Sequence, residues 1–350
     1  MLSEDIIVPE ALRHMRRFPL DGALLLFDRD TGVNALCEGD ETAGLRQLAP
    51  RMVQFGITNA CNLACTFCSR DLTAKSQWTP GSAFEILSQL CSFGVLEVAF
   101  GGGEPWFFPG FADLVVRLYQ ETSLAVNLTT NGLHMTKQEL RKIHGKYGQI
   151  RLSLYNNNDW RNKVAELADQ RARFGVNYLV TPERLTEIEA TILELCSLGC
   201  TDILLLSYNG PNPNLHLDAC QTKALSETTT LLAKALTHRC QIKLDVCWGE
   251  RMEGVPRLFP KSDCGAGREF LVLTSDKNVQ PCSFHQLSIP FQNAMDVMNI
   301  WNERKSELLS ASSLPGCARV YGFGLGELKK ECREQDQGNK KALNVVSIGE

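Results

Sequence analysis

The segment from residue 52 to residue 68 reads MVQFGITNACNLACTFC, an apolar run followed at once by three closely spaced cysteines. Residues 52–57 have the length and apolar character of a buried strand. From residue 51 onward, similar short apolar runs alternate with amphipathic stretches of helical length. This alternation is typical of βα units that surround a parallel sheet.

The alternation continues through six or seven βα units without a long hydrophilic linker. We expect buried strands, several of them continuously apolar, at residues 52–57, 96–100, 124–128, 150–154, 176–180, 203–206 and 242–246. Helices are expected between them, at residues 82–93, 111–122, 137–147, 160–173, 184–198 and 221–237. The pattern favours an α/β fold with a full or partial β/α barrel over a Rossmann sheet of two halves. Of these we expect a partial TIM barrel of the (β/α)6 type.

The rest of the chain lacks this alternation. Residues 1–50 form an N-terminal extension with a predicted hairpin at residues 23–27 and 33–36. The barrel is expected to span residues 51–247, followed by a small loop-rich unit at residues 248–335. Within that unit, the pattern predicts a hairpin at residues 270–279, turning at residues 275–278, and a helix at residues 297–309. Residues 336–350 read as a polar tail.

Composition excludes several classes of protein. The 36 basic and 40 acidic residues give a net charge of −4, without the long basic run that a nucleic-acid partner would favour. No apolar run approaches the roughly 18 residues that cross a bilayer, and the N-terminus does not read as a secretory signal. We therefore expect a cytoplasmic protein that binds neither nucleic acid nor a membrane. Fourteen cysteines are unusual in that compartment unless some bind metal.

The three cysteines after the first strand, Cys61, Cys65 and Cys68, form the strongest candidate site. In a barrel, the loops at the carboxyl ends of the strands build the active site. The spacing lets one irregular loop wrap three thiolates around an iron–sulfur cluster and leaves one iron of a four-iron cluster without a protein ligand. The alternatives are incidental cysteines or a zinc site, although zinc ordinarily needs a fourth nearby ligand.

This spacing resembles the CxxxCxxC motif of the radical S-adenosylmethionine enzymes, with Phe67 at the aromatic position before the third cysteine. Three later segments are similar to motifs of the same superfamily, in the same order. The run of Gly101, Gly102, Gly103, Glu104 and Pro105 resembles the GGEP motif, which holds the methionyl amino group. Thr130 and Asn131 lie in a TNG strand ending. Ser153 matches a serine that lies near the ribose and carboxylate of the cofactor.

The resemblance implies a 4Fe–4S cluster on the three cysteines, with S-adenosylmethionine bound to its open iron. One electron would then split the cofactor into methionine and a 5′-deoxyadenosyl radical, which abstracts a hydrogen atom from the substrate. A reducing partner such as flavodoxin or ferredoxin would supply the electron. Neither a catalytic acid or base nor an oligomeric state is assigned by the sequence.

A second set of cysteines lies in the loop-rich unit, at Cys264, Cys282 and Cys317. The arrangement around the predicted hairpin resembles a SPASM or twitch domain, which implies one auxiliary 4Fe–4S cluster. Cys332 is our preferred fourth ligand. Cys247, His285 or an open position remain alternatives. Four thiolates around a hairpin also describe a zinc ribbon, so zinc is the main rival.

The resemblance covers roughly residues 51–332 and implies two kinds of substrate. We place first the maturation of a ribosomally made peptide by a cross-link, a thioether or an epimerisation. The alternative is oxidation or rearrangement of a small molecule such as a sugar or an aminoglycoside. A zinc protein, or a non-catalytic iron–sulfur carrier, is the remote alternative. The loop from Tyr208 to Asn214 is the predicted place of substrate contact.

Overall fold

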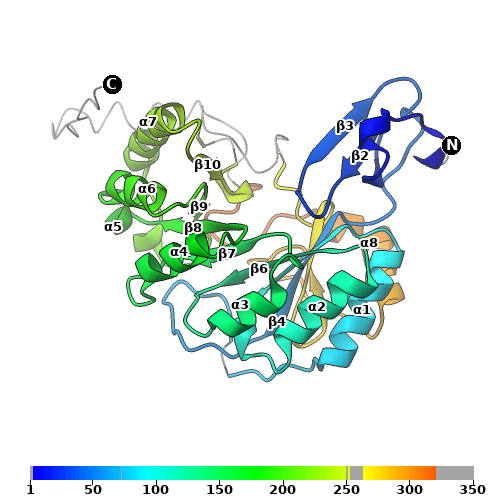
Figure 1. Cartoon of the computed structure of the whole chain (residues 1–350), viewed down its shortest axis with the longest axis horizontal. Coiled ribbons are helices and arrows are strands. Elements are labelled where there is room, and N and C mark those ends of the chain that lie inside the picture. The colour runs from blue at the N-terminus through cyan, green and yellow to red at the C-terminus, as the bar shows by residue number, and fades with distance from the viewer. Residues whose placement is uncertain (1–2, 72, 250, 253–262, 321–350) are drawn as a thin grey trace.

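The computed structural model describes residues 3–71, 73–249, 251–252 and 263–320 (Figure 1). Its first element is an antiparallel sheet of β1 (Arg16–Leu20), β2 (Ala23–Phe27) and β3 (Asn34–Glu38). The predicted hairpin corresponds to β2 and β3, whereas β1 was not predicted. Short 3-10 helices precede this sheet, η1 (Ser3–Asp5) and η2 (Glu10–Leu12).

The second sheet has ten strands, in the order β10-β9-β8-β7-β6-β5-β4-β11-β12-β13. Its first seven strands follow the chain in reverse order, and each is parallel to its neighbour. They are β4 (Met52–Thr58), β5 (Glu97–Gly102), β6 (Ala125–Thr130), β7 (Ile150–Ser153), β8 (Phe174–Val180), β9 (Asp202–Ser207) and β10 (Gln241–Leu244). Within the described residues β10 and β13 are free edges, so the predicted partial barrel is confirmed and is not closed.

Helices follow the strands and cover one face of this sheet (Figure 1). They are α1 (Pro80–Ser92), α2 (Phe111–Glu121), α3 (Lys137–Ile143), α4 (Trp160–Asp169), α5 (Pro182–Leu185), α6 (Ile188–Ser197) and α7 (Ala219–Ala235). The 3-10 helices η3 (Pro105–Phe107), η4 (Pro213–Leu215) and η5 (Val246–Trp248) lie in the segments that follow β5, β9 and β10. Capping boxes at Thr79, Thr136 and Asp218 start α1, α3 and α7.

Three predicted helices are shorter or divided, each for a local reason. Arg171, with a φ of 51°, and Gly145, with a φ of 71°, are left-handed residues beyond the ends of α4 and α3. The predicted helix at 184–198 is two helices, because Glu187 bonds back three residues to Arg184 and interrupts the α-helical pattern. The strand predicted at 242–246 ends at Leu244, because Asp245 caps η5.

The strands bury one face and leave the other half-exposed. On β4, Val53, Phe55 and Ile57 are at most 1% exposed and belong to the main hydrophobic core. Gln54, between them, is only half-buried. Because neighbouring side chains on a strand point to opposite faces, the helix-covered face is apolar and the other face is partly polar. β4 is therefore not one of the several strands expected to be continuously apolar, whereas Ile203, Leu204 and Leu205 of β9 are buried in succession.

The C-terminal segment continues the same sheet. β11 (Phe270–Leu273) pairs with β4 in parallel, and β12 (Asn278–Gln280) and β13 (Ile289–Pro290) add antiparallel strands. The predicted hairpin therefore lies where expected, but it extends the barrel sheet. The predicted helix at 297–309 is α8 (Ala294–Glu303) followed by α9 (Lys305–Leu308), and a capping box at Asn293 makes it start earlier. The predicted unit boundaries stay predictions, and the polar tail lies outside the described residues.

The N-terminal sheet packs where β5 and β6 begin. Phe18, Leu25 and Phe27 form a small apolar cluster with Leu96 and Ala125. This contact lies opposite the carboxyl ends of the parallel strands, where the predicted site residues lie. None of the described helices combines the length and the apolar character needed to span a membrane.

Leu271 tests whether β11 belongs to the core. The side chain is fully buried in the main cluster, so Leu271→Ala should lower the free energy of unfolding by about 2–5 kcal/mol. Leu231, 53% exposed on α7, is the matched control, and its replacement by alanine should change the value by less than about 0.5 kcal/mol. Urea unfolding followed by tryptophan fluorescence measures both. A loss below about 1 kcal/mol at Leu271 would contradict this assignment.

Candidate active site

The cysteine loop leaves the carboxyl end of β4, as predicted. Cys68 donates its backbone N–H to the carbonyl of Cys65 at 3.0 Å, and Leu63 N–H donates to Cys61 Sγ at 3.4 Å. Burial raises the pKa of Cys61 and of Cys65, and the neighbouring thiols of the loop raise both further. The three sulfurs therefore lie within electrostatic range of one another. A bound cation would favour their thiolate forms.

Glycines allow the loop after β5 to approach the loop after β4. Gly103 N–H donates to the carbonyl of Thr58 at 2.6 Å, and Glu104 N–H donates to that of Ala60 at 2.8 Å. A Cβ on Gly103 would lie 2.2 Å from the oxygen of Ala60. Gly102 has a φ of 107°, and a Cβ there would lie 2.4 Å from the oxygen of Thr58. Only residues without a side chain allow this approach.

Glu104 organises the site from the centre. Its carboxylate is 1% exposed and accepts hydrogen bonds from Thr130 Oγ1 at 2.7 Å, Asn131 N–H at 2.7 Å and, more weakly, Trp106 N–H at 3.4 Å. Burial raises the pKa of Glu104, and these hydrogen bonds oppose the rise. The sequence predicted Glu104, Thr130 and Asn131 as separate contacts, but the structure joins them in one network. Pro105, also predicted, is buried at the start of η3.

Asn131 connects this network to the cysteine loop. Its Nδ2 donates to Asn62 Oδ1 at 2.9 Å and lies 3.8 Å from Cys61 Sγ. The predicted Phe67 packs against Tyr155, with ring centroids 5.5 Å apart. Burial raises the pKa of Tyr155 to about 12, so this phenol stays neutral at ordinary pH.

The end of β7 is held by a residue that the sequence did not single out. Ser153, predicted, is buried beside Asn158, which is fully buried and hydrogen-bonds to the carbonyls of both Ser153 and Asn131. The sequence signal for Asn158 is its position directly before Asp159, the residue that precedes α4. Asparagine is common at turns of this kind, where its side chain bonds to the backbone. The predicted residue Gly101 differs from Gly102 and Gly103, because a Cβ at Gly101 would meet no atom within 4 Å.

The second cysteine set also comes together. Burial raises the pKa of Cys282 to about 11, and the nearby thiols of Cys264 and Cys317 contribute to the rise. Arg319 bonds to both carboxylate oxygens of Asp263, at 2.9 and 3.1 Å. Because Asp263 precedes Cys264 and Arg319 follows Cys317 closely, this ion pair holds the two cysteine segments together.

The structure narrows the alternatives for the fourth ligand of the second cysteine set. Cys332 lies outside the described residues. Both ring nitrogens of His285 are engaged, Nδ1 with Leu287 N–H at 2.9 Å and Nε2 with Ser310 Oγ at 3.2 Å. Cys247 lies close enough for Cys264 and Cys282 to raise its pKa, although burial is the larger cause. Of the described alternatives, Cys247 is therefore the better placed.

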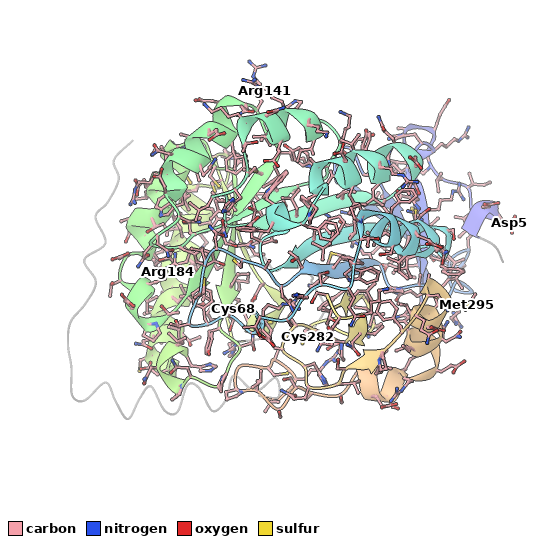
Figure 2. The ribbon with its side chains drawn as sticks, turned by 90° about the horizontal axis from the view of Figure 1, so that it is seen from below. Asp5, Cys68, Arg141, Arg184, Cys282 and Met295 are labelled. Atoms are coloured by element: carbon pink, nitrogen blue, oxygen red, sulfur yellow. The ribbon has the colours of Figure 1, made fainter. Side chains whose placement is uncertain are left out.

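Arg70 lies between the two cysteine sets. Its Nη2 donates to Ser283 Oγ at 3.3 Å, so the residue that follows Cys282 contacts a residue two positions beyond Cys68. Figure 2 shows Cys68 and Cys282 next to each other in the same region. In neither set, nor elsewhere among the described residues, do three Cys, His, Asp or Glu side chains close around one point as a finished metal site. The donor chemistry of both sets nevertheless fits iron–sulfur ligation.

The predicted substrate loop meets the second cysteine set. A Cβ on Gly316, which precedes Cys317, would lie 2.5 Å from the carbonyl of Tyr208. Tyr208 and Asn209 are buried, whereas residues 211–214 are exposed. A separate cavity of about 1600 Å³ lies along the half-exposed face of the sheet and reaches Thr129 but not the cysteine loop. Asp202 at this cavity is paired with Arg151 and Lys243.

Comparisons with known proteins agree with this geometry. Residues 55–159 match the family model of the radical SAM superfamily. The chain is 31% identical over 106 residues to GTP 3′,8-cyclase of Chlorobaculum tepidum. This alignment covers 29% of this chain and 32% of that protein. It is 24% identical over 279 residues to PqqA peptide cyclase of Gluconobacter oxydans, covering 70% of this chain and 75% of that protein.

Among solved structures, Streptococcus suis SuiB bound to S-adenosylmethionine has a similar fold. The TM-score is 0.63 at 17% identity, over 75% of this chain and 68% of SuiB. SuiB bound to its precursor peptide SuiA gives a TM-score of 0.62 at 16% identity, over 75% of this chain and 67% of SuiB.

The matched residues carry the three cysteines and the loops of Glu104, Asn131 and Ser153, and they define a radical SAM domain. The chain therefore contains a radical SAM domain at residues 55–159. Such a domain implies a 4Fe–4S cluster and S-adenosylmethionine as cofactors.

Gly101, near the end of β5, and Gly103, just after it, provide a matched pair for testing the close approach of the loops after β4 and β5. Gly103→Ala places a Cβ under 3.0 Å from three backbone atoms, so the backbone must shift. We expect a loss of about 1–3 kcal/mol in the free energy of unfolding. Gly101→Ala meets no atom within 4 Å and should stay within about 0.5 kcal/mol of the wild type. Urea unfolding measures both variants. Equal losses in the free energy of unfolding would contradict the close contact between the loops after β4 and β5.

Proposed function

We propose that this chain is a radical SAM enzyme that takes a hydrogen atom from a ribosomally made peptide and so introduces a cross-link, a thioether or an epimerised residue. The single observation that carries the proposal is the network at the carboxyl ends of β4 to β7. There, hydrogen bonds join a buried carboxylate, three amide side chains and the thiol of Cys61, which shares its loop with Cys65 and Cys68. The match of residues 55–159 to the radical SAM superfamily supports radical chemistry at this network.

In this proposal Cys61, Cys65 and Cys68 hold three irons of a 4Fe–4S cluster. When bound, the reduced cluster and S-adenosylmethionine supply the 5′-deoxyadenosyl radical for hydrogen abstraction. The chain's own residues bind and orient. The segment Gly101–Pro105 and the TNG ending with Thr130 and Asn131 receive the methionyl end of the cofactor, Ser153 lies toward its ribose and carboxylate, and Phe67 lines the cluster loop.

The charges of the site support a cationic cofactor. Burial raises the pKa of Glu104 and of Cys61, and at Cys61 the neighbouring Glu104 and Cys68 add to the rise, so a bound cation would stabilise the charged forms of these groups. S-adenosylmethionine carries an ammonium and a sulfonium. Each positive group would find negative groups or hydrogen-bond acceptors within this region.

We further propose an auxiliary 4Fe–4S cluster on Cys264, Cys282 and Cys317, with Cys332 or Cys247 as the fourth ligand. The support is the gathering of these thiols around β11 and β12 and the ion pair of Arg319 with Asp263. Because Arg70 bonds to Ser283, the two proposed clusters would lie in one neighbourhood. An auxiliary cluster could accept an electron from a substrate radical.

A peptide substrate is supported by two named relatives. PqqA peptide cyclase matches most of this chain, and SuiB, similar in fold, has been solved with a precursor peptide. A small molecule is the second candidate, because GTP 3′,8-cyclase of Chlorobaculum tepidum, also a relative, is named for a nucleotide substrate. We place the exposed part of the loop Tyr208–Asn214 at the substrate. The electron donor would be a flavodoxin or ferredoxin, in keeping with a cytoplasmic enzyme.

Product analysis tests the radical chemistry. After anaerobic reconstitution, the wild type with dithionite and S-adenosylmethionine should form 5′-deoxyadenosine, and Cys65→Ala should form none, because it lacks one cluster ligand. Cys37→Ala is the control, since Cys37 is a half-buried cysteine on β3. It should match the wild type. Absence of product from the wild type, or undiminished product from Cys65→Ala, would contradict the proposal.

Iron counting tests the auxiliary cluster. The reconstituted wild type should hold about eight irons per chain, and Cys282→Ala should hold about four. Cys282→Ala should still form 5′-deoxyadenosine, because its first cluster is intact. About four irons together with one zinc in the wild type would instead favour a zinc ribbon at this place.

A further inference from the structure

Asn158 lies between β7 and α4, and its side chain is fully buried. Its Nδ2 donates to the carbonyl of Ser153 at 2.7 Å and to the carbonyl of Asn131 at 2.8 Å. Its Oδ1 accepts from the N–H of Tyr155 at 3.1 Å. An asparagine side chain has two donor hydrogens and one acceptor oxygen, so both donors and the acceptor are used.

These three partners belong to different parts of the candidate site. Asn131, after β6, bonds to Glu104 and to Asn62 of the cysteine loop. Ser153 ends β7, and the ring of Tyr155 packs against Phe67 in the cysteine loop. One buried amide group therefore connects the loops that follow β6 and β7, and through them it reaches the loops that follow β4 and β5.

Regular structure holds only the start of this segment, where Leu154 N–H donates to the carbonyl of Asn177 on β8 at 3.0 Å. β7 ends at Ser153 and α4 begins at Trp160, and between them Asp159 has a φ of 45°, a conformation that few side chains adopt. The backbone at Tyr155 is fixed instead by the bond to Asn158 Oδ1. The relative placement of Asn131 and Ser153 thus depends on a side chain rather than on sheet pairing alone.

The geometry points to Asn158 as a positioning residue for S-adenosylmethionine, one that holds Asn131 and Ser153 at the separation that the bound cofactor requires. This inference rests on the proposed function. Asn158 bonds to the backbone of both loops and is fully buried, so it does not itself meet the cofactor. Its loss should therefore weaken cofactor binding more than it slows the bond cleavage that follows.

Two variants separate positioning from packing. Asn158→Ala removes all three hydrogen bonds. Asn158→Asp keeps the volume of the side chain and the oxygen that accepts from Tyr155 N–H. Its second carboxylate oxygen, however, faces the carbonyls of Asn131 and Ser153, which accepted hydrogen bonds from the Asn158 amide. Thr229→Val is the matched control, because Thr229 on α7 is also fully buried, bonds at 2.7 Å to the carbonyl of Leu225, and lies away from the site.

The experiment uses the reconstituted enzymes with dithionite and measures kcat and the KM for S-adenosylmethionine in 5′-deoxyadenosine formation. We expect both Asn158 variants to raise KM by about tenfold or more, as for residues that orient ligand-binding groups, and to change kcat less. In both Asn158 variants, a higher concentration of S-adenosylmethionine than in the wild type should be needed to change the electron paramagnetic resonance spectrum of the reduced cluster. Thr229→Val should lower Tm but keep the wild-type KM.

Each outcome decides the question. A KM within twofold of the wild type in either folded variant overturns the inference, as does an equal rise in Thr229→Val. If Asn158→Ala does not fold, Asn158→Asp decides, and loss of the fold in both variants shows a structural role and also overturns the inference. A wild type that forms no 5′-deoxyadenosine overturns the proposed function itself.

Discussion

The site depends on the close contact between the loops that leave β4 and β5. Two backbone hydrogen bonds, from Gly103 and Glu104 to the carbonyls of Thr58 and Ala60, join these loops where no side chain would fit. This contact places the carboxylate of Glu104 beside the cysteine loop, and the carboxylate then draws in Thr130 and the backbone of Asn131. Parallel strand order brings the loops to one edge, but the absence of a Cβ sets their separation.

The network built on this contact is almost fully satisfied by the protein. Glu104 accepts three hydrogen bonds, and Asn131 is held from both sides, by Glu104 at its N–H and by Asn158 at its carbonyl. Buried polar groups are costly when unpaired and specify one arrangement when paired. The site is therefore arranged before a ligand arrives, which lowers the conformational cost of binding.

Much of the architecture could be predicted from the sequence, because its signals are local. Apolar runs located the seven parallel strands, and the cysteine and glycine motifs located the loops that converge. What escaped prediction depends on contacts between distant segments. The parallel pairing of β11 with β4 leaves no periodic trace, and the short β1 contains Pro19, which is uncommon inside strands. Spacing left Cys247 as one of several alternatives for the second cysteine set, because its nearness to Cys264, like the contacts of Asn158, depends on tertiary packing.

The pairing of β11 with β4 has a consequence for the nascent chain. The two strands are separated by roughly two hundred residues, a long-range contact of the kind that slows folding. At about 5–20 residues per second, a ribosome needs on the order of ten seconds or more to reach β11 after β4 has emerged. Throughout this time one edge of β4 has no neighbour, directly beside an open loop of thiols. Molecular chaperones that shield unpaired edges would thus matter most for this protein during its own synthesis.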